Sequence, residues 1–321
     1  MPLGDHAQAE GTSDQHPIII PGVKASEFRN LMKMIYCPLS DAFFVDIHSD
    51  RQSSTKAHRE LVFCSDIARL SHRFGIPRFE KWAEGEIMHL LTRSAGNLNA
   101  YTLRQNDPIT SILPTLAYAK LTLNKRLEYE LQHGIQYCSI LPVVLPPTSL
   151  LNLMHNLGRR EEPALFGFWF MLLLNLGYKT WQDEAFTKED RIALFLAQAR
   201  LTPVLACLGR DLVFPLLTWP NPGHNGQLKA LQGRICLDRC ARKIRGVWFT
   251  LFDSEYYEVI TSGVALTPTT MLCELPSIRS DFADDLRRLS TCKCKTEALS
   301  WLDEDIRQLF VRLAEYYQDI N

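Results

Sequence analysis

The spacing of apolar residues near the start of the chain predicts a short strand followed by an amphipathic helix. Residues 18–20 are three isoleucines, whose β-branched side chains favour a buried strand, and the Pro21 and Gly22 that follow favour a turn. Ser26 can then accept a hydrogen bond from the first amides of a helix. One apolar stripe follows at helical spacing: Phe28, Leu31, Met32, Ile35 and Tyr36. This pattern is typical of a packing module.

The rest of the chain keeps a helical pattern, and alternating β runs are few. Thr187 and Asp190 have the spacing of a capping box before a helix over 191–200. A last helix is expected over 299–317, and it would dock against the helix that carries Trp248 if zinc brought together the two cysteine pairs near these helices. The apolar stripe of the last helix consists of Leu302, Ile306, Leu309, Phe310, Leu313 and Tyr317. The predicted fold class is mostly α.

The longest apolar run is ALFGFWFMLLLNL, residues 164–176. It falls short of the roughly 20 residues that a membrane-spanning helix needs. Glu161 and Glu162 precede Pro163, and acidic residues and an early proline are typical of a helix N-terminus. The run therefore predicts a helix buried on all sides, and a membrane-associated or partner-binding face is the alternative.

Two segments resemble a known fold. The string V-x-x-S-E-F-x-x-L-M-x-x-I-Y, from Val23 to Tyr36, resembles a strand and helix of the BTB/POZ fold, and residues 61–91 are similar to the two helices that follow there. More narrowly, the layout resembles the BTB-domain proteins of mushroom-forming fungi. Because only residues 1–16 precede Pro17, the resemblance implies a truncated BTB-like α/β module with the N-terminal half of that fold missing, followed by an all-helical C-terminal region.

The resemblance implies a non-enzymatic protein–protein interaction module, either an adaptor or a scaffold. Its partners would be other proteins or a second copy of the chain, and the family's adaptors serve cullin-type ubiquitin ligases. The contacting helix of the family corresponds here to residues 27–34, so the implied interaction residues are Glu27, Phe28, Leu31 and Met34. Since the missing half carries most of the family's dimer surface and supports the adaptor role, the usual dimer and cullin binding are not expected.

The predicted organisation has four parts. Residues 1–16 are expected to form a disordered tail, and residues 17–95 the partial BTB-like module. Residues 96–205 stand where adaptors carry a BACK-type helical region, and residues 206–321 form a C-terminal helical region with a cysteine cluster.

Composition narrows the function classes. The chain has 321 residues, 46% hydrophobic and 22% charged, and a net charge of −1, which gives no general attraction to nucleic acid or membranes. The first 16 residues are polar and contain no secretory signal, so an intracellular location is expected, with nucleus and cytoplasm not distinguished. No common catalytic motif occurs, and the acidic runs 284–285 and 303–305 are interpreted as solvated helix faces or as partners of the dipole at a helix N-terminus.

Nine cysteines in such a chain argue against a disulfide framework. Cys236 and Cys240 form one pair on a predicted helix, and Cys292 and Cys294 form another; four thiolates meet the count of a structural zinc site. Cys273 is a substitute ligand. The spacing is not that of a common zinc finger, so reduced core thiols are the main alternative.

A locally basic helix suggests a second function. Six cations occur within residues 229–245, against the single acid Asp238: Lys229, Arg234, Arg239, Arg242, Lys243 and Arg245. Cations on one exposed helix face bind phosphate backbones, so the alternative hypothesis is a zinc-stabilised helical domain that binds nucleic acid or chromatin. A solvated or acid-paired helix is the simpler interpretation of the same pattern.

Overall fold

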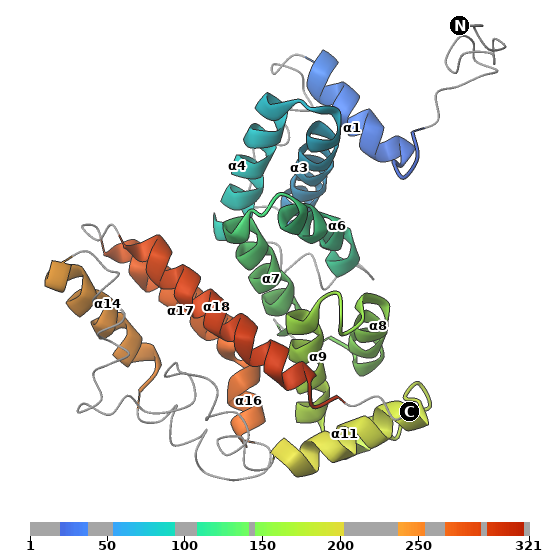
Figure 1. The fold of residues 1–321 in the computed structure, drawn as a ribbon, viewed down its shortest axis with the longest axis vertical. Coiled ribbons are helices and arrows are strands. Elements are labelled where there is room, and N and C mark those ends of the chain that lie inside the picture. The colour runs from blue at the N-terminus through green and yellow to red at the C-terminus, as the bar shows by residue number, and fades with distance from the viewer. Residues whose placement is uncertain are drawn as a thin grey trace, which may run out of the picture. The chain divides into compact units, whose positions relative to one another are not determined.

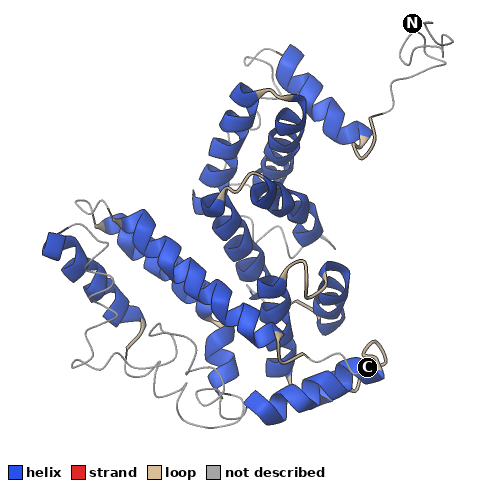
Figure 2. Ribbon diagram, viewed as in Figure 1, coloured by secondary structure: helices blue, strands red, loops and turns tan. Residues whose placement is uncertain are grey.

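The computed structural model describes residues 20–37, 54–93, 108–140, 145–201, 237–253, 267–289 and 294–317. Within these ranges the chain forms helices joined by turns and contains no strand (Figure 2), so the mostly α prediction is confirmed at this level. Ile20 precedes a turn at Pro21 and Gly22, outside any regular element, while the other two isoleucines lie outside the described residues. The α/β character expected for the BTB-like module is therefore not seen in the described part of the chain.

The chain divides into two compact units, Met1–Tyr101 with Thr110–Tyr118, and Thr102–Ile109 with Ala119–Asn321. The helices of the first unit are α1 (Ala25–Tyr36), α3 (Ser54–Phe74), α4 (Pro77–Arg93) and most of α6 (Pro108–Leu121) (Figure 1). The second unit contains α7 (Lys125–Ile140), α8 (Pro147–Leu157), α9 (Pro163–Leu176), α10 (Tyr178–Trp181), α11 (Lys188–Leu201), α14 (Leu237–Leu251), α16 (Thr267–Cys273), α17 (Leu275–Arg288) and α18 (Lys295–Ala314). The regions predicted as 96–205 and 206–321 thus fall mainly in one unit.

Helix α1 lies antiparallel to α3. The Asn30 side chain donates a hydrogen bond to Asp66 at 2.8 Å, and Arg69 lies 3.5 Å from Glu27. Residues later in α1 thus pair with residues earlier in α3. Leu31, which follows Asn30 in α1, is only 1% exposed, because it lies in the contact between the two helices.

The start of α1 differs from the sequence prediction by two residues. The helix begins at Ala25, and the Glu27 carboxylate accepts a hydrogen bond from the backbone N–H of Lys24 at 3.3 Å. Ser26 is an exposed residue inside the helix and does not cap it. An acidic side chain near a helix N-terminus is stabilised by the helix dipole, which explains why Glu27 takes this role.

The apolar run predicted as a buried helix forms α9, and this prediction is confirmed. Every residue from Ala164 to Leu174 is buried, with Phe168, Trp169 and Phe170 fully enclosed. Buried Trp169 also donates a hydrogen bond to the hydroxyl of Ser139 at 3.0 Å. Helices α8, α16 and α18 pack around α9, so α9 is the centre of the second unit (Figure 1).

Helix α18 lies directly against α9 at Gly167. A Cβ atom at this position would overlap the backbone carbonyl of Phe310, so only glycine allows the observed contact. Next to it, the Phe168 and Phe310 rings meet edge to face with centroids 5.1 Å apart. The predicted apolar stripe of α18 is buried, but among the described residues the helix packs mainly on α9, α7 and α17 rather than on the helix of Trp248. The ring of Trp248, in α14, stacks on Phe252 and packs edge to face against Phe282 of α17.

The predicted capping box at Thr187 and Asp190 is confirmed and does more than cap α11. The Thr187 backbone N–H donates to the Asp190 carboxylate at 2.9 Å, and the Asp190 N–H donates to the Thr187 hydroxyl at 3.1 Å. His155 of α8 and the Tyr317 hydroxyl also bind this carboxylate, at 2.9 and 2.5 Å. Although burial by itself raises the pKa of Asp190, these hydrogen bonds outweigh it and lower the pKa, so the carboxylate stays ionised. The cap thereby ties α8, α11 and the segment just after α18 together.

Candidate functional site

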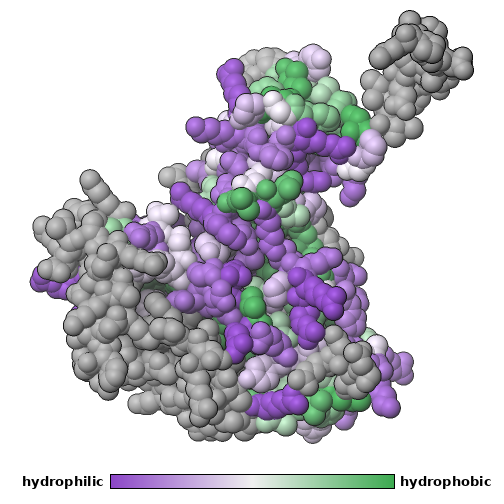
Figure 3. Space-filling model, viewed as in Figure 1, coloured by the Kyte–Doolittle hydropathy of each residue, from purple (hydrophilic) through white to green (hydrophobic). Residues whose placement is uncertain are grey.

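The candidate interaction site is the side of α1 that α3 does not cover. Tyr36 is 78% exposed, Ile35 is 39% exposed, and Phe74 at the end of α3 is 40% exposed. Phe28 is half-buried and meets the ring of Phe74 edge to face, with centroids 6.4 Å apart. Figure 3 shows apolar side chains gathered over α1. We call Phe28, Met32, Ile35, Tyr36 and Phe74 the α1 band.

Because α1 packs on α3, the four predicted interaction residues have different surroundings. Leu31 is buried in that contact, and Glu27 is held by Arg69, so both serve the fold. Met34 is half-buried, and Phe28 belongs to the α1 band. The predicted interaction residues did not include Ile35 and Tyr36, although both belong to the apolar stripe of this helix and both are exposed. The width of the apolar stripe of α1 indicates that part of it is exposed. At 100° per residue, the stripe extends over more of the helix surface than one neighbouring helix can cover.

The charges beside the α1 band are mainly positive. Lys24 and Arg29 are exposed, and Lys33 is half-buried on the same helix. Arg73 of α3 is also exposed, and its guanidinium donates a hydrogen bond to the backbone carbonyl of Pro21 at 2.8 Å. Glu27 is the single acidic residue of α1, and it is engaged by Arg69.

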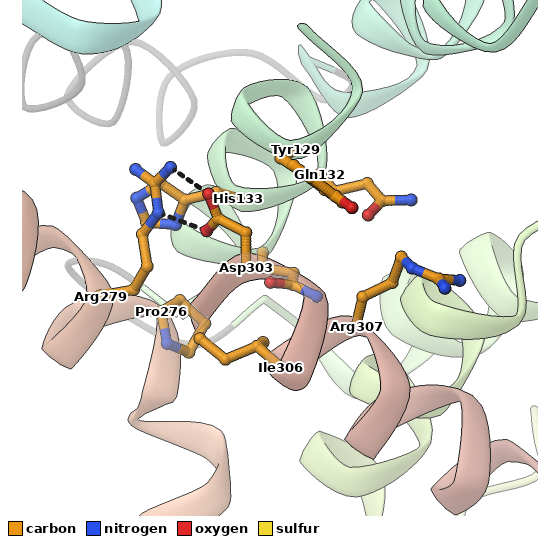
Figure 4. A pocket seen from close by; sticks show the side chains of 9 residues that line it. Tyr129, Gln132, His133, Pro276, Arg279, Asp303, Ile306 and Arg307 are labelled. Carbon is orange, nitrogen blue, oxygen red and sulfur yellow. Dashed lines mark hydrogen bonds and ion pairs between the residues drawn. The ribbon is translucent and has the colours of Figure 1, made fainter. Parts of the chain in front are cut away.

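A second polar site lies within the second unit, where α7, α17 and α18 meet (Figure 4). Arg279 donates two hydrogen bonds to Asp303, at 2.7 and 2.9 Å, and lies 3.0 Å from Glu130. The three side chains are at most 8% exposed. Burial lowers the pKa of Arg279, but the two carboxylates outweigh it and raise the pKa, so the guanidinium stays charged. Buried charges of this kind require pairing, and this triad supplies it.

His133 of α7 lies beside this triad. Its Nε2 is 3.0 Å from the hydroxyl of Ser280, whereas its buried Nδ1 has no hydrogen-bond partner among the described residues. Burial, and secondly the charge of Arg279, hold the pKa of His133 well below 6.5. The imidazole is therefore neutral at physiological pH.

The interpretation of the acidic run 303–305 as a solvated helix face is wrong. Asp303 pairs with Arg279, and Glu304 accepts hydrogen bonds from Arg307 and from the hydroxyl of Tyr129, the latter at 2.7 Å. The hydrogen bond from Arg307 is the main reason why the pKa of Glu304 falls to about 2. In the run 284–285, by contrast, both residues form surface pairs with arginines three residues on, as expected of a solvated face.

The space enclosed at this second site is small. Its cavity volume is about 10 Å³, which holds roughly one water molecule. Ligand pockets typically measure on the order of 300–1,000 Å³. The polar residues of this site therefore hold three helices together and leave no room for a substrate.

Asp305 is expected to make folding pH-dependent. Burial, followed by the charge of Glu304, raises the pKa of Asp305 to about 8 from an ordinary 3.8. Between about pH 4 and pH 8, the folded chain holds a proton on Asp305 that the unfolded chain releases. Asp305 therefore costs no stability below about pH 4, and its cost grows as the pH rises towards 8. Asp305→Asn removes this titrating group. Relative to the unchanged protein, the free energy of unfolding of the variant should therefore rise by on the order of 2–4 kcal/mol between about pH 4 and pH 8. Urea denaturation at both pH values measures this shift, and a difference independent of pH contradicts the argument.

The predicted zinc ligands are only partly described. Cys240 is half-buried on α14 and Cys294 is buried just before α18, while Cys236 and Cys292 lie outside the described residues. Within the described ranges, no three His, Cys, Asp or Glu side chains are grouped so that they could hold a metal ion. Burial raises the pKa of the substitute ligand Cys273, which favours its thiol form. The four-cysteine site stays a prediction, and metal analysis of the purified protein distinguishes bound zinc from reduced thiols.

The predicted basic helix corresponds in part to α14. Its inward residues Ile244 and Trp248 are buried, as expected. On the other side Arg242 is exposed, while Lys243 and Arg245 are half-buried. Among the described side chains of this helix, one exposed arginine is too little charge to form a phosphate-binding face. The nucleic-acid hypothesis therefore gains no support from the described part of α14.

Comparison of the chain with protein-family models, with curated proteins and with solved structures gave no match. Among the described helices, none is both long and apolar enough to cross a membrane.

Proposed function

We propose that this protein is a non-enzymatic protein–protein interaction module, an adaptor or scaffold of BTB type, whose contact surface is the α1 band. The observation that supports it best is the exposure of Ile35 and Tyr36 at the C-terminal end of α1 and of Phe74 beside Phe28, nearer its N-terminal end. Aromatic side chains beside a partly filled apolar surface are typical of the anchors of protein interfaces.

The resemblance to the BTB fold adds support of a limited kind. Helices α1, α3 and α4 occupy the segments for which the resemblance predicts helices. Because the described residues contain no strand, the α/β part of the resemblance has no support there, and the proposal depends on the helices alone. Cullin-type ligases are partners suggested by the family, but the proposed contact does not require them.

The polar site of the second unit adds no evidence for catalysis. This site encloses space for about one water molecule, and its charged groups are bound to one another. A general acid or base must be able to reach a substrate, and these groups do not.

Exposed residues of the α1 band should affect binding more than stability. We expect the double variant Ile35→Ser with Tyr36→Ser to reduce partner recovery about 10-fold or more, because loss of an aromatic anchor costs about 2 kcal/mol in typical interfaces. Its melting temperature should change little. Quantitative cross-linking in cells measures recovery, and circular dichroism measures melting.

Two control variants make this test specific. Leu121→Ser with Leu123→Ser changes two leucines outside α1 that are also highly exposed, and should leave recovery of the same partners unchanged. Leu31→Ala removes a buried side chain, and should destabilise the protein by about 2–5 kcal/mol. Equal recovery of every partner with the double variant and the unchanged protein contradicts the proposed function.

A further inference from the structure

We infer that the α1 band receives an acidic amphipathic helix of a partner protein. This inference rests on the proposed function and names the class of partner. Three features of the first unit carry it: the spacing of the apolar residues, the sign of the charges beside them, and the position of the band at the edge of the contact between α1 and α3.

The spacing of the band suits a helical partner. Phe28, Met32 and Ile35 stand at i, i+4 and i+7, so they lie in one row along α1. Leu31 lies on the inner side of that row, against α3, and Tyr36 on its outer side. Phe74 lengthens the row at its N-terminal end through its contact with Phe28. An amphipathic helix presents apolar residues at the same intervals, so two such rows can pack along each other.

The charges select an acidic partner. On a helical wheel, Arg29 and Lys33 follow directly after Tyr36 on the solvent side of the row, and Lys24 and Arg73 lie near its N-terminal end. Opposite charges across an interface favour the correct partner and speed its association. Since Glu27 is turned towards Arg69, α1 presents no acidic side chain that would repel Asp or Glu on the partner.

The position of the band favours a helix over a lipid surface. A helix that lies on a membrane buries the middle of its apolar face among the acyl chains. In α1 the inner edge of that face is already occupied, because Leu31 packs on α3 and is 1% exposed. The remaining apolar surface is one flank of α1 beside the end of α3, which matches the width of a single helix better than a plane.

The inference is tested with two synthetic helical peptides of about five turns that differ only in charge. Both carry leucines at i, i+3, i+4 and i+7; one has glutamates beside the leucines and the other has lysines. Fluorescence anisotropy with the full chain should show at least 10-fold tighter binding of the glutamate peptide, with affinity falling as salt rises. In the variant Arg29→Glu with Lys33→Glu, the preference should reverse. Circular dichroism checks that this variant is folded.

The outcomes separate the inference from the proposed function. Equal binding of the two peptides, an unchanged preference in the charge-reversed variant, or no peptide binding overturns the acidic-helix inference. Binding of phosphatidylserine vesicles that is lost in the same variant, without peptide binding, overturns it in favour of a membrane. If Ile35→Ser with Tyr36→Ser still reduces partner recovery in cells, the proposed function survives these results; if recovery is unchanged, both fail.

Discussion

Replacing Gly167 with alanine is expected to destabilise the protein by about 3 kcal/mol or more, since the added methyl group would overlap the Phe310 carbonyl. A backbone atom on a helix cannot move away as a flexible side chain can, so α9 and α18 would have to separate. That separation would weaken the contacts of Phe168 with Phe310 and of other buried residues between the two helices. Denaturant unfolding followed by circular dichroism measures the loss.

Gly246→Ala provides the matched control. Gly246 also lies inside a helix, α14, but a Cβ there would meet no atom within 4 Å. Alanine is favoured over glycine in a helix by roughly 0.5–1 kcal/mol, so this variant should be as stable as the unchanged protein or slightly more stable. A Gly167→Ala variant as stable as Gly246→Ala would show that α9 and α18 do not approach as described.

Replacing Arg279 with methionine is the second change with a large expected effect. The substitution keeps much of the side-chain volume but leaves Asp303 and Glu130 buried without their cation. Removing one partner of a buried ion pair typically costs about 3–5 kcal/mol. Because the two carboxylates can take up protons instead, the loss should be smaller at acidic pH than at neutral pH. Unfolding by urea at both pH values measures the size and the pH dependence of the effect.

Two further variants identify the cause. Arg287→Ala removes an arginine from an exposed pair with Asp284, and should cost less than about 1 kcal/mol. Replacing Arg279, Asp303 and Glu130 together with apolar residues of similar volume should recover most of the stability lost by Arg279→Met, because no uncompensated charge is then buried. If the triple variant is as unstable as Arg279→Met, lost packing and not lost pairing is the cause.

Features that depend on neighbours in the sequence could be predicted from the residues alone. The run 164–176 has no polar side, so a helix made from it had to be buried, and α9 is. The stripe of α18 has the period of a helix, and it is buried as expected. Thr187 and Asp190 form their capping box because a cap involves residues three apart. These features follow from helix geometry, which is set by local spacing.

The candidate site was predicted only in part, for a physical reason. The motif pointed to α1, but the residues chosen there included Leu31, which the contact with α3 buries, and omitted Tyr36, which it leaves exposed. A stripe shows which residues share a face, and it does not show how much of that face a neighbour covers. The zinc prediction depends on pairs of cysteines that are far apart in the sequence, two of which lie outside the described residues.

The amino-acid sequence by itself therefore determined where the chain forms helices and which of them are too apolar for solvent. The tertiary structure decided which helices meet. Glu130, Arg279 and Asp303 are distant in sequence, and nothing in their own surroundings predicts that they form one buried triad. The same holds for Gly167, an unremarkable residue in α9 until the Phe310 carbonyl of α18 lies against it. The period of a helix is a local property, whereas pairing and coverage depend on which distant surfaces fit together, and that is decided only when the whole unit packs.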